Sequence, residues 1–146
     1  KVVALLNDIN GKLYVRTDSE YFIPNHLINP EVINYQFELM ALRNDPSHVV
    51  VNVENTSDTA WPNKAGLQNS YGSVRIGLAK DDSTLLTEQA IRCDLPGTIY
   101  PGHSISVECP IPEELQRENT LSIGLVHEGY NWFHLVNQVS PYHLQR

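Results

Sequence analysis

The sequence predicts an all-β protein, namely an antiparallel β-sandwich of the jelly-roll or immunoglobulin-like type. Three observations predict this fold. Short runs of alternating apolar and polar residues fill most of the chain, they recur about every ten residues, and segments rich in Pro, Gly, Asn and Asp separate them. The 146 residues are enough for one domain with its own hydrophobic core.

Each predicted strand has an inner and an outer face, because successive side chains of a strand point to opposite sides. The predicted strands are 32–42, 48–58, 72–80, 104–109, 120–128 and 131–136, with a weaker one at 84–92. In the clearest of them, Val49, Val51 and Val53 share one face. Residues 32–42 also have helical propensity, but their alternation favours a strand.

Two further segments interrupt the series of strands. Residues 112–118 are predicted to form one helical turn that begins at a proline. Residues 1–31 are less regular, and we expect a linker or a strand-exchange arm there, with 11–16 as a possible edge strand. The sandwich itself is expected to span residues 32–146.

Composition and charge exclude several kinds of partner. The net charge is −7, and an acidic domain repels a phosphate backbone, so we expect no nucleic-acid partner. The apolar runs are too short to cross a membrane. Charged residues make up 18% of the chain, so much of the surface must be neutral and polar. The chain begins at Lys1 without a methionine, as a piece of a longer protein would.

The chain has two cysteines, Cys93 and Cys109. A disulfide between them would close a modest loop. Two cysteines in a domain with its own core do not make a disulfide framework, however, and we expect both to be reduced and half-buried.

The segment LVHEGYNWFHL, residues 125–135, has three interpretations. A metal site is disfavoured because His127 and Glu128 are successive strand residues and no metal-binding motif is present. A core hairpin would bury Trp132 or Phe133 and hydrogen-bond His127 as a structural histidine. A sugar-binding surface would combine a flat aromatic ring, planar polar groups and small residues, here Ser122 and Gly124.

The turn of this hairpin decides which side chains share a face. If Gly129 and Tyr130 form a two-residue type II′ turn, Trp132 lies opposite His127. A loop longer by one residue moves the second strand's side chains to the other face. The sequence leaves both registers open.

The segment NTSDTAWP, residues 55–62, predicts a structural plug. Asn55 is expected to end a strand and begin an Asx-type turn, and Trp61, held extended by Pro62, is expected to cap one end of the sandwich. Neither a nucleophile elbow nor a phosphate-binding loop occurs, and the carboxylates are scattered. We therefore expect no catalytic residues.

Four segments occur in a recognisable order: VVVNVENTSDTAWP, VRIGLAK, IRCDLPGTIYPGHSISVECPIP and LSIGLVHEGYNWF. Together, over roughly residues 33 to 137, they resemble the C-terminal carbohydrate-binding domain of the ATPase subunit of O-antigen polysaccharide ABC exporters (Wzt-type). The residues that match the shared pattern are Trp61, Arg92, Pro96, Pro101, Gly102, Glu128, Trp132 and Phe133.

The resemblance implies a non-catalytic domain that binds the non-reducing end of lipid-linked O-antigen, the polysaccharide of lipopolysaccharide, for export. It implies a homodimer in the cytoplasm, held at the inner membrane by a transporter subunit through the parent protein. It implies no cofactor and no metal, with ATP bound only by a separate domain of the parent chain. Glycan specificity is then expected on the variable sheet face, at Tyr71, Arg75, Glu88, Gln89, Ser122, Tyr130 and Trp132.

Three alternatives stay open at this point. The domain could be an accessory module of a polysaccharide glycosyltransferase, a purely structural dimerisation module, or a sandwich enzyme with an unrecognised carboxylate pair. Walker motifs or a sugar-nucleotide fold in the preceding chain would separate the first alternative from the exporter hypothesis.

Overall fold

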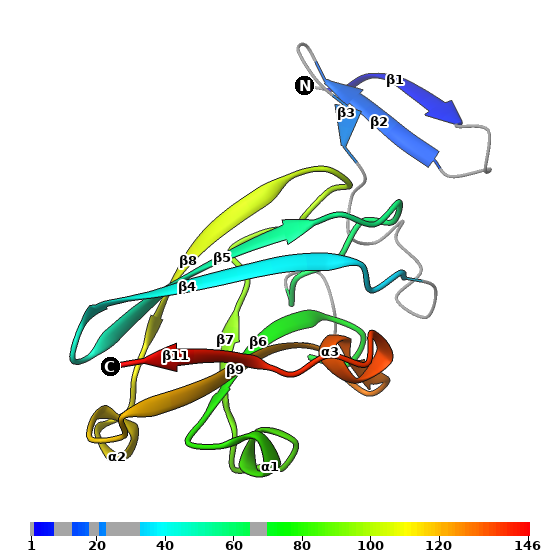
Figure 1. The fold of residues 1–146 in the computed structure, drawn as a ribbon. Coiled ribbons are helices and arrows are strands. Elements are labelled where there is room, and N and C mark those ends of the chain that lie inside the picture. The colour runs from blue at the N-terminus through cyan, green and yellow to red at the C-terminus, as the bar shows by residue number, and fades with distance from the viewer. Residues whose placement is uncertain (1, 8–12, 18–20, 23–32, 65–69) are drawn as a thin grey trace.

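The computed structural model describes residues 2–7, 13–17, 21–22, 33–64 and 70–146, and it confirms an all-β antiparallel sandwich (Figure 1). One sheet has the order β4-β5-β8, and the facing sheet has the order β10-β9-β6-β7, with β11 also paired to β9. The strands of the first sheet are β4 (Phe37–Asp45), β5 (His48–Asn55) and β8 (Ser104–Pro110). Those of the second are β6 (Val74–Ala79), β7 (Ile91–Asp94), β9 (Thr120–His127), β10 (Asn131–Trp132) and β11 (Tyr142–Gln145).

The strand order favours the immunoglobulin-like type over the jelly roll. Counted from β4, the first, second and fifth strands (β4, β5 and β8) form one sheet. The third, fourth and sixth strands (β6, β7 and β9) form the other sheet together with the last strand, which consists of β10 and β11. The last strand is split, because β10 and β11 pair with different parts of β9. A short helix, α3 (Phe133–Val136), lies between these two halves.

The N-terminal part forms a sheet of its own in the described residues. Strands β1 (Val2–Asn7), β2 (Leu13–Thr17) and β3 (Tyr21–Phe22) pair in that order, all antiparallel. The strand predicted at 11–16 overlaps β2, but the prediction that it is an edge strand is wrong, because β2 pairs with both β1 and β3. The remaining residues of 1–31 lie outside the described part, and the role of this segment as a linker or arm stays a prediction.

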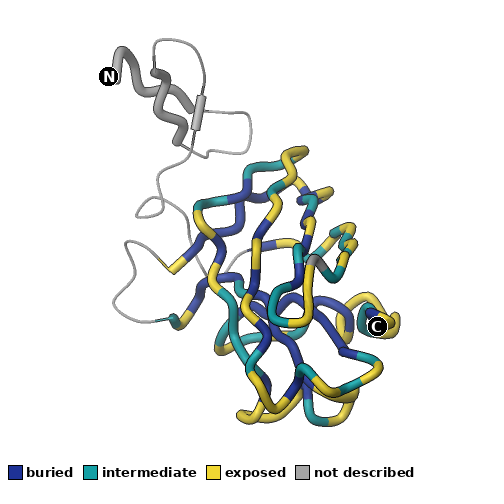
Figure 2. The backbone as a smooth tube through the Cα atoms, turned by 90° about the vertical axis from the view of Figure 1, so that its left-hand side faces the viewer, coloured by how far each residue is buried: buried dark blue, intermediate teal, exposed yellow. Residues whose placement is uncertain are grey.

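The predicted alternation is confirmed in the core strands of both sheets. In β5, Val49, Val51 and Val53 are all fully buried. The same alternation places Ile76 and Leu78 of β6 and Leu121, Ile123 and Leu125 of β9 in the core between the sheets. Strand β4 begins later than predicted, but Ile33 and Tyr35 still pack against that core. Figure 2 shows buried and exposed stretches alternating along the backbone of the sandwich.

The strand predictions for two segments, 84–92 and 131–136, are wrong in part. Residues 84–92 contain the end of helix α1 (Asp82–Leu85) and a turn, and strand β7 begins only at Ile91. Asp81 caps α1, since its carboxylate accepts a hydrogen bond of 2.7 Å from the backbone N–H of Thr84. Residues 133–136 are helical, whereas the helical turn predicted near 112–118 is confirmed as α2 (Glu113–Gln116).

Aromatic residues fill one end of the core as predicted. Trp61 is fully buried, and its indole N–H donates to the carbonyl of Asn34 at 2.8 Å. The ring of Phe133 meets that of Trp61 edge to face, with centroids 4.9 Å apart. Asn55 forms the expected Asx turn by accepting from the backbone N–H of Ser57 at 2.9 Å. No helix in the described residues is long and apolar enough to cross a membrane.

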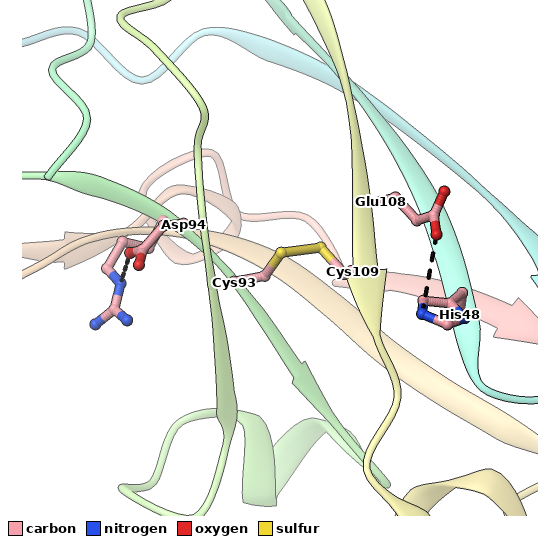
Figure 3. The surroundings of a disulfide bond; sticks show 6 residues. His48, Cys93, Asp94, Glu108 and Cys109 are labelled. Carbon is pink, nitrogen blue, oxygen red and sulfur yellow. Dashed lines mark hydrogen bonds and ion pairs between the residues drawn. A yellow bond between two sulfur atoms is a disulfide. The ribbon is translucent and has the colours of Figure 1, made fainter. Parts of the chain in front are cut away.

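The prediction that the two cysteines are reduced is wrong. Cys93 of β7 and Cys109 of β8 form a disulfide that joins the two sheets, with their Cα atoms 5.9 Å apart (Figure 3). Both side chains face the core, Cys93 together with Ile91 and Cys109 together with Val107. The two strands are neighbours in sequence but belong to opposite sheets, so the inward side chains meet across the core.

Reduction of this disulfide is expected to destabilise the domain. The two cysteines are 16 residues apart. Opening a loop of this size increases the conformational entropy of the unfolded chain and stabilises the unfolded state by about 3 kcal/mol. We expect urea unfolding of the oxidised protein to show a free energy about 2–4 kcal/mol above that of the reduced protein or of a Cys93→Ala/Cys109→Ala variant. Equal unfolding free energies, or two reactive thiols in the oxidised folded protein, would contradict the bond.

Candidate functional site

The register of the β9–β10 hairpin decides the candidate site. Asn131 pairs with His127 and Trp132 with Val126, so the loop holds three residues with Gly129 at φ 88° in its centre. The two-residue turn is therefore wrong, and the longer alternative is confirmed. Trp132 lies on the outer face of the sheet, while Phe133 is buried in the core.

Strand pairing arranges the outer face of this sheet in rows. Trp132 pairs with Val126, Val126 with Arg75, and Arg75 with Asp94. In the next row Gly124 pairs with Gly77, and Gly77 with Arg92. The outer face thus carries one indole ring, two guanidinium groups and a carboxylate around two glycines. We call Arg75, Arg92, Asp94, Glu128 and Trp132 the outer-face cluster.

Ion pairs hold the outer-face cluster together. The Nε of Arg75 lies 2.7 Å from Asp94, and its Nη1 lies 3.1 Å from Glu128. The Nε of Arg92 lies 3.4 Å from Glu128, and its guanidinium carbon is 5.0 Å from the centroid of the Trp132 ring. This distance suits a cation–π contact. Glu128 therefore bridges the two arginines, and Arg92 lies against the indole.

The two glycines leave room for large side chains. A Cβ atom on Gly77 would come within 2.6 Å of Cη2 of Trp132, so the indole packs directly on the strand. A Cβ on Gly124 would lie 3.2 Å from Nδ1 of His134 and 3.4 Å from Cδ2 of Leu85. The shallow groove expected at Ser122 and Gly124 is thus filled by side chains from α1 and α3.

Ser122 belongs to a hydrogen-bonded set of polar side chains that also contains Asp82 and His143. It is only 2% exposed, and its hydroxyl donates to Asp82 at 2.7 Å. The same carboxylate oxygen lies 2.7 Å from Nε2 of His143. The hydrogen bond from Ser122, with a smaller contribution from His143, lowers the pKa of Asp82. Ser122 is a structural hydrogen-bond donor here and is not open to a ligand.

The two predicted tyrosines lie together at the hairpin end of the sheet. The rings of Tyr71 and Tyr130 are 5.3 Å apart, and Tyr71 is 56% exposed. Tyr130 also stacks on His127 at 4.4 Å. His127 is fully buried, with Nδ1 2.7 Å from the hydroxyl of Tyr35, which confirms it as a structural histidine.

The seven predicted ligand-binding residues therefore do not form one cluster. Arg75 and Trp132 share the outer face, while Tyr71 and Tyr130 contact each other at the hairpin end of the sheet, where Tyr130 lies against the buried His127. Glu88 and Gln89 are exposed in the loop between α1 and β7. Of the seven, only Arg75 and Trp132 belong to the outer-face cluster.

Arg92, Asp94 and Glu128 join the cluster although they were not predicted to bind a ligand. The alternation of side chains within β7 could have predicted the positions of Arg92 and Asp94. Ile91 and Cys93 face inward, which places Arg92 and Asp94 on the same outer face as Arg75.

A pocket of about 550 Å³ lies at the edge of the sandwich between β4 and β9, where the last strand is interrupted. Its walls come from β4, the middle of β9 and the stretch from α3 to the start of β11, including Phe37, Gly124, His134, Asn137 and Tyr142. Burial lowers the pKa of His134, partly offset by the charge of Asp82. His134 connects the pocket to the outer-face cluster, because its ring lies 5.8 Å from that of Trp132.

Within the described residues, no three His, Cys, Asp or Glu side chains are placed to hold a metal ion. No protein-family model, curated protein or solved structure matches this chain. The function of this chain is therefore inferred from the geometry of the outer-face cluster and from the order of its sequence segments.

The contact between Trp132 and Gly77 leads to a testable prediction. Gly77→Ala should displace the indole and lower the free energy of unfolding by about 1–3 kcal/mol. Gly97→Ala is the matched control, since a Cβ there meets nothing within 4 Å, and we expect a change below about 0.5 kcal/mol. Urea unfolding and tryptophan fluorescence measure both variants. Equal stability of the two variants would contradict the packing of Trp132 on Gly77.

Burial of His134 predicts a pH dependence of stability. Its folded-state pKa lies below the ordinary value of 6.5, so near that pH the unfolded chain binds a proton that the folded protein does not. The free energy of unfolding should therefore fall as the pH drops through 6.5 and level off below the folded-state pKa. Asp82, with a pKa below 3.8, loses its contribution only at lower pH.

A histidine substitution isolates this effect. His134→Gln should flatten the decline in unfolding free energy between about pH 7.5 and about pH 5. The same substitution at His103, an exposed residue, is the control and should keep the wild-type slope. An unchanged slope in His134→Gln would show that this histidine does not couple folding to protonation.

Proposed function

We propose that the sandwich is a non-catalytic glycan-binding domain that recognises the non-reducing end of lipid-linked O-antigen polysaccharide for export by an ABC transporter. The outer-face cluster is the observation that carries this proposal. It combines a partly exposed indole ring with guanidinium and carboxylate groups on one sheet face. The order of the sequence segments, which resembles the exporter family, supports the exporter part.

The chemistry of the cluster suits a sugar. The apolar C–H face of a pyranose packs against an aromatic ring, and its hydroxyls bond to planar polar groups. Asp94, whose side chain is 44% exposed, offers a carboxylate at the edge of the cluster. Polar ligands exchange water for protein hydrogen bonds at a small net gain, so each site binds weakly. A dimer holding two glycan ends would bind more tightly through avidity.

End recognition can be tested with two forms of one polymer. The domain is titrated with O-polysaccharide from its own source, intact and after trimming of the non-reducing terminus, and binding is followed by calorimetry. We expect binding of the intact polymer and its loss after trimming. Equal binding of both forms would contradict end recognition, and binding of neither would contradict the function.

The site can be tested with a pair of variants. Asp94→Ala should weaken binding of the intact polymer about ten-fold, which corresponds to about 1.4 kcal/mol. Glu108→Ala is the control, because Glu108 is similarly exposed but lies on β8 of the other sheet (Figure 3). If Glu108→Ala weakened binding as much as Asp94→Ala, the outer-face cluster would not be the site.

A second candidate, a dimerisation module, is favoured by exposed apolar residues on β4. Met40 is 68% and Leu42 71% exposed, and both lie on the outer face of an edge strand. Large apolar side chains on an edge strand favour contact with another chain. A dimer that dissociates in Met40→Lys/Leu42→Lys and binds no glycan would favour this function over the first.

A further inference from the structure

We infer that the glycan end bound by the outer-face cluster is uncharged, carrying hydroxyl groups but no carboxylate, phosphate or sulfate. This inference rests on the proposed function and names the class of sugar that the same site takes. It follows from how the charges of the cluster are arranged.

The charges of the cluster balance. Arg75 and Arg92 contribute +2, and Asp94 and Glu128 contribute −2, so the sum is zero. Each guanidinium already has a carboxylate within 3.4 Å. A site built for an anionic sugar would instead keep at least one cation uncompensated and open to the ligand.

Burial makes these ion pairs hard to exchange. The side chains of Arg75, Arg92 and Glu128 are 16%, 22% and 17% exposed. An anion that bound to either arginine would compete with Glu128 for it. Glu128 would then lose one ion pair while its carboxylate stayed partly buried, which is unfavourable. Nη1 of Arg92 has no hydrogen-bond partner in the described part of the chain, but it is buried and out of reach of an anion on the surface.

A hydroxyl group needs no such exchange. It both donates and accepts hydrogen bonds, so it can donate to the open side of Asp94 while the ion pair to Arg75 stays in place. The long-range field acts in the same direction. The chain carries a net charge of −7, which repels an approaching anionic polymer and has no effect on a neutral one.

A panel of immobilised oligosaccharides tests the inference with the wild-type chain. The neutral set holds oligomers of mannose, galactose, rhamnose and N-acetylglucosamine, and the acidic set holds uronic-acid, sialylated and phosphorylated oligomers. We expect binding within the neutral set and at least ten-fold weaker binding throughout the acidic set. The neutral affinity should change less than about two-fold between low and high salt, because no ion pair forms with the ligand.

Two variants separate the charge of the site from the charge of the chain. Asp94→Asn and Glu108→Gln each raise the net charge by one, but only Asp94 belongs to the cluster. We expect Asp94→Asn to leave the Nε of Arg75 without its carboxylate, to give the cluster a net charge of +1, and to strengthen binding of acidic oligomers several-fold. Glu108→Gln should leave the ratio of acidic to neutral binding unchanged. The amide NMR spectrum confirms that both variants are folded.

The outcomes distinguish this inference from the function on which it rests. Wild-type protein that prefers acidic oligomers, with an affinity that falls as salt rises, overturns the inference and leaves glycan binding intact. Identical acidic binding in the two variants also overturns it. Binding of no oligosaccharide in either set contradicts the proposed function itself.

Discussion

The packing of Phe133 between the two sheets is the constraint on which the rest of the structure depends. Its ring meets Tyr35, Phe37 and Trp61 edge to face, with centroids between 4.8 and 5.8 Å apart. Strand β10 ends at Trp132, and a helical turn begins at this fully buried phenylalanine. Since Phe133 faces inward, Trp132 faces outward. The packing of Phe133 in the core is thereby linked to the position of the indole on the outer face.

The outer face then follows from small residues and paired charges. Gly77 and Gly124 lie side by side in β6 and β9, and their missing side chains admit Trp132, Leu85 and His134. Glu128 links the arginines of two strands, which fixes their positions around the ring. The disulfide ties the same sheet to its partner. Disulfides persist in oxidising compartments, so this bond stands against the cytoplasmic location that the exporter hypothesis implies.

Alternation in the sequence predicted the sandwich because the core strands have one apolar face, as Val49, Val51 and Val53 illustrate. Alternation failed where a local interaction overrides it. The Asp81 cap favours a helix at residues 82–85, and a second helical turn replaces the predicted strand at 133–136. The hairpin register and the disulfide depend on how distant strands align, which spacing alone does not specify. For the site, Arg75 and Trp132 were predicted, whereas Arg92 and Asp94 were missed because β7 was placed too early in the chain.

The most direct measurement is a map of amide and indole NMR shifts of the domain during titration with O-polysaccharide from its own source. We expect shifts concentrated at Trp132, including its indole N–H, and at Arg75, Arg92 and Asp94, with little change on β4, β5 and β8. Shifts concentrated on those three strands would place the ligand on the opposite sheet and contradict the outer-face cluster as the binding site. No shifts at saturating polymer would contradict the claim that this face binds a glycan.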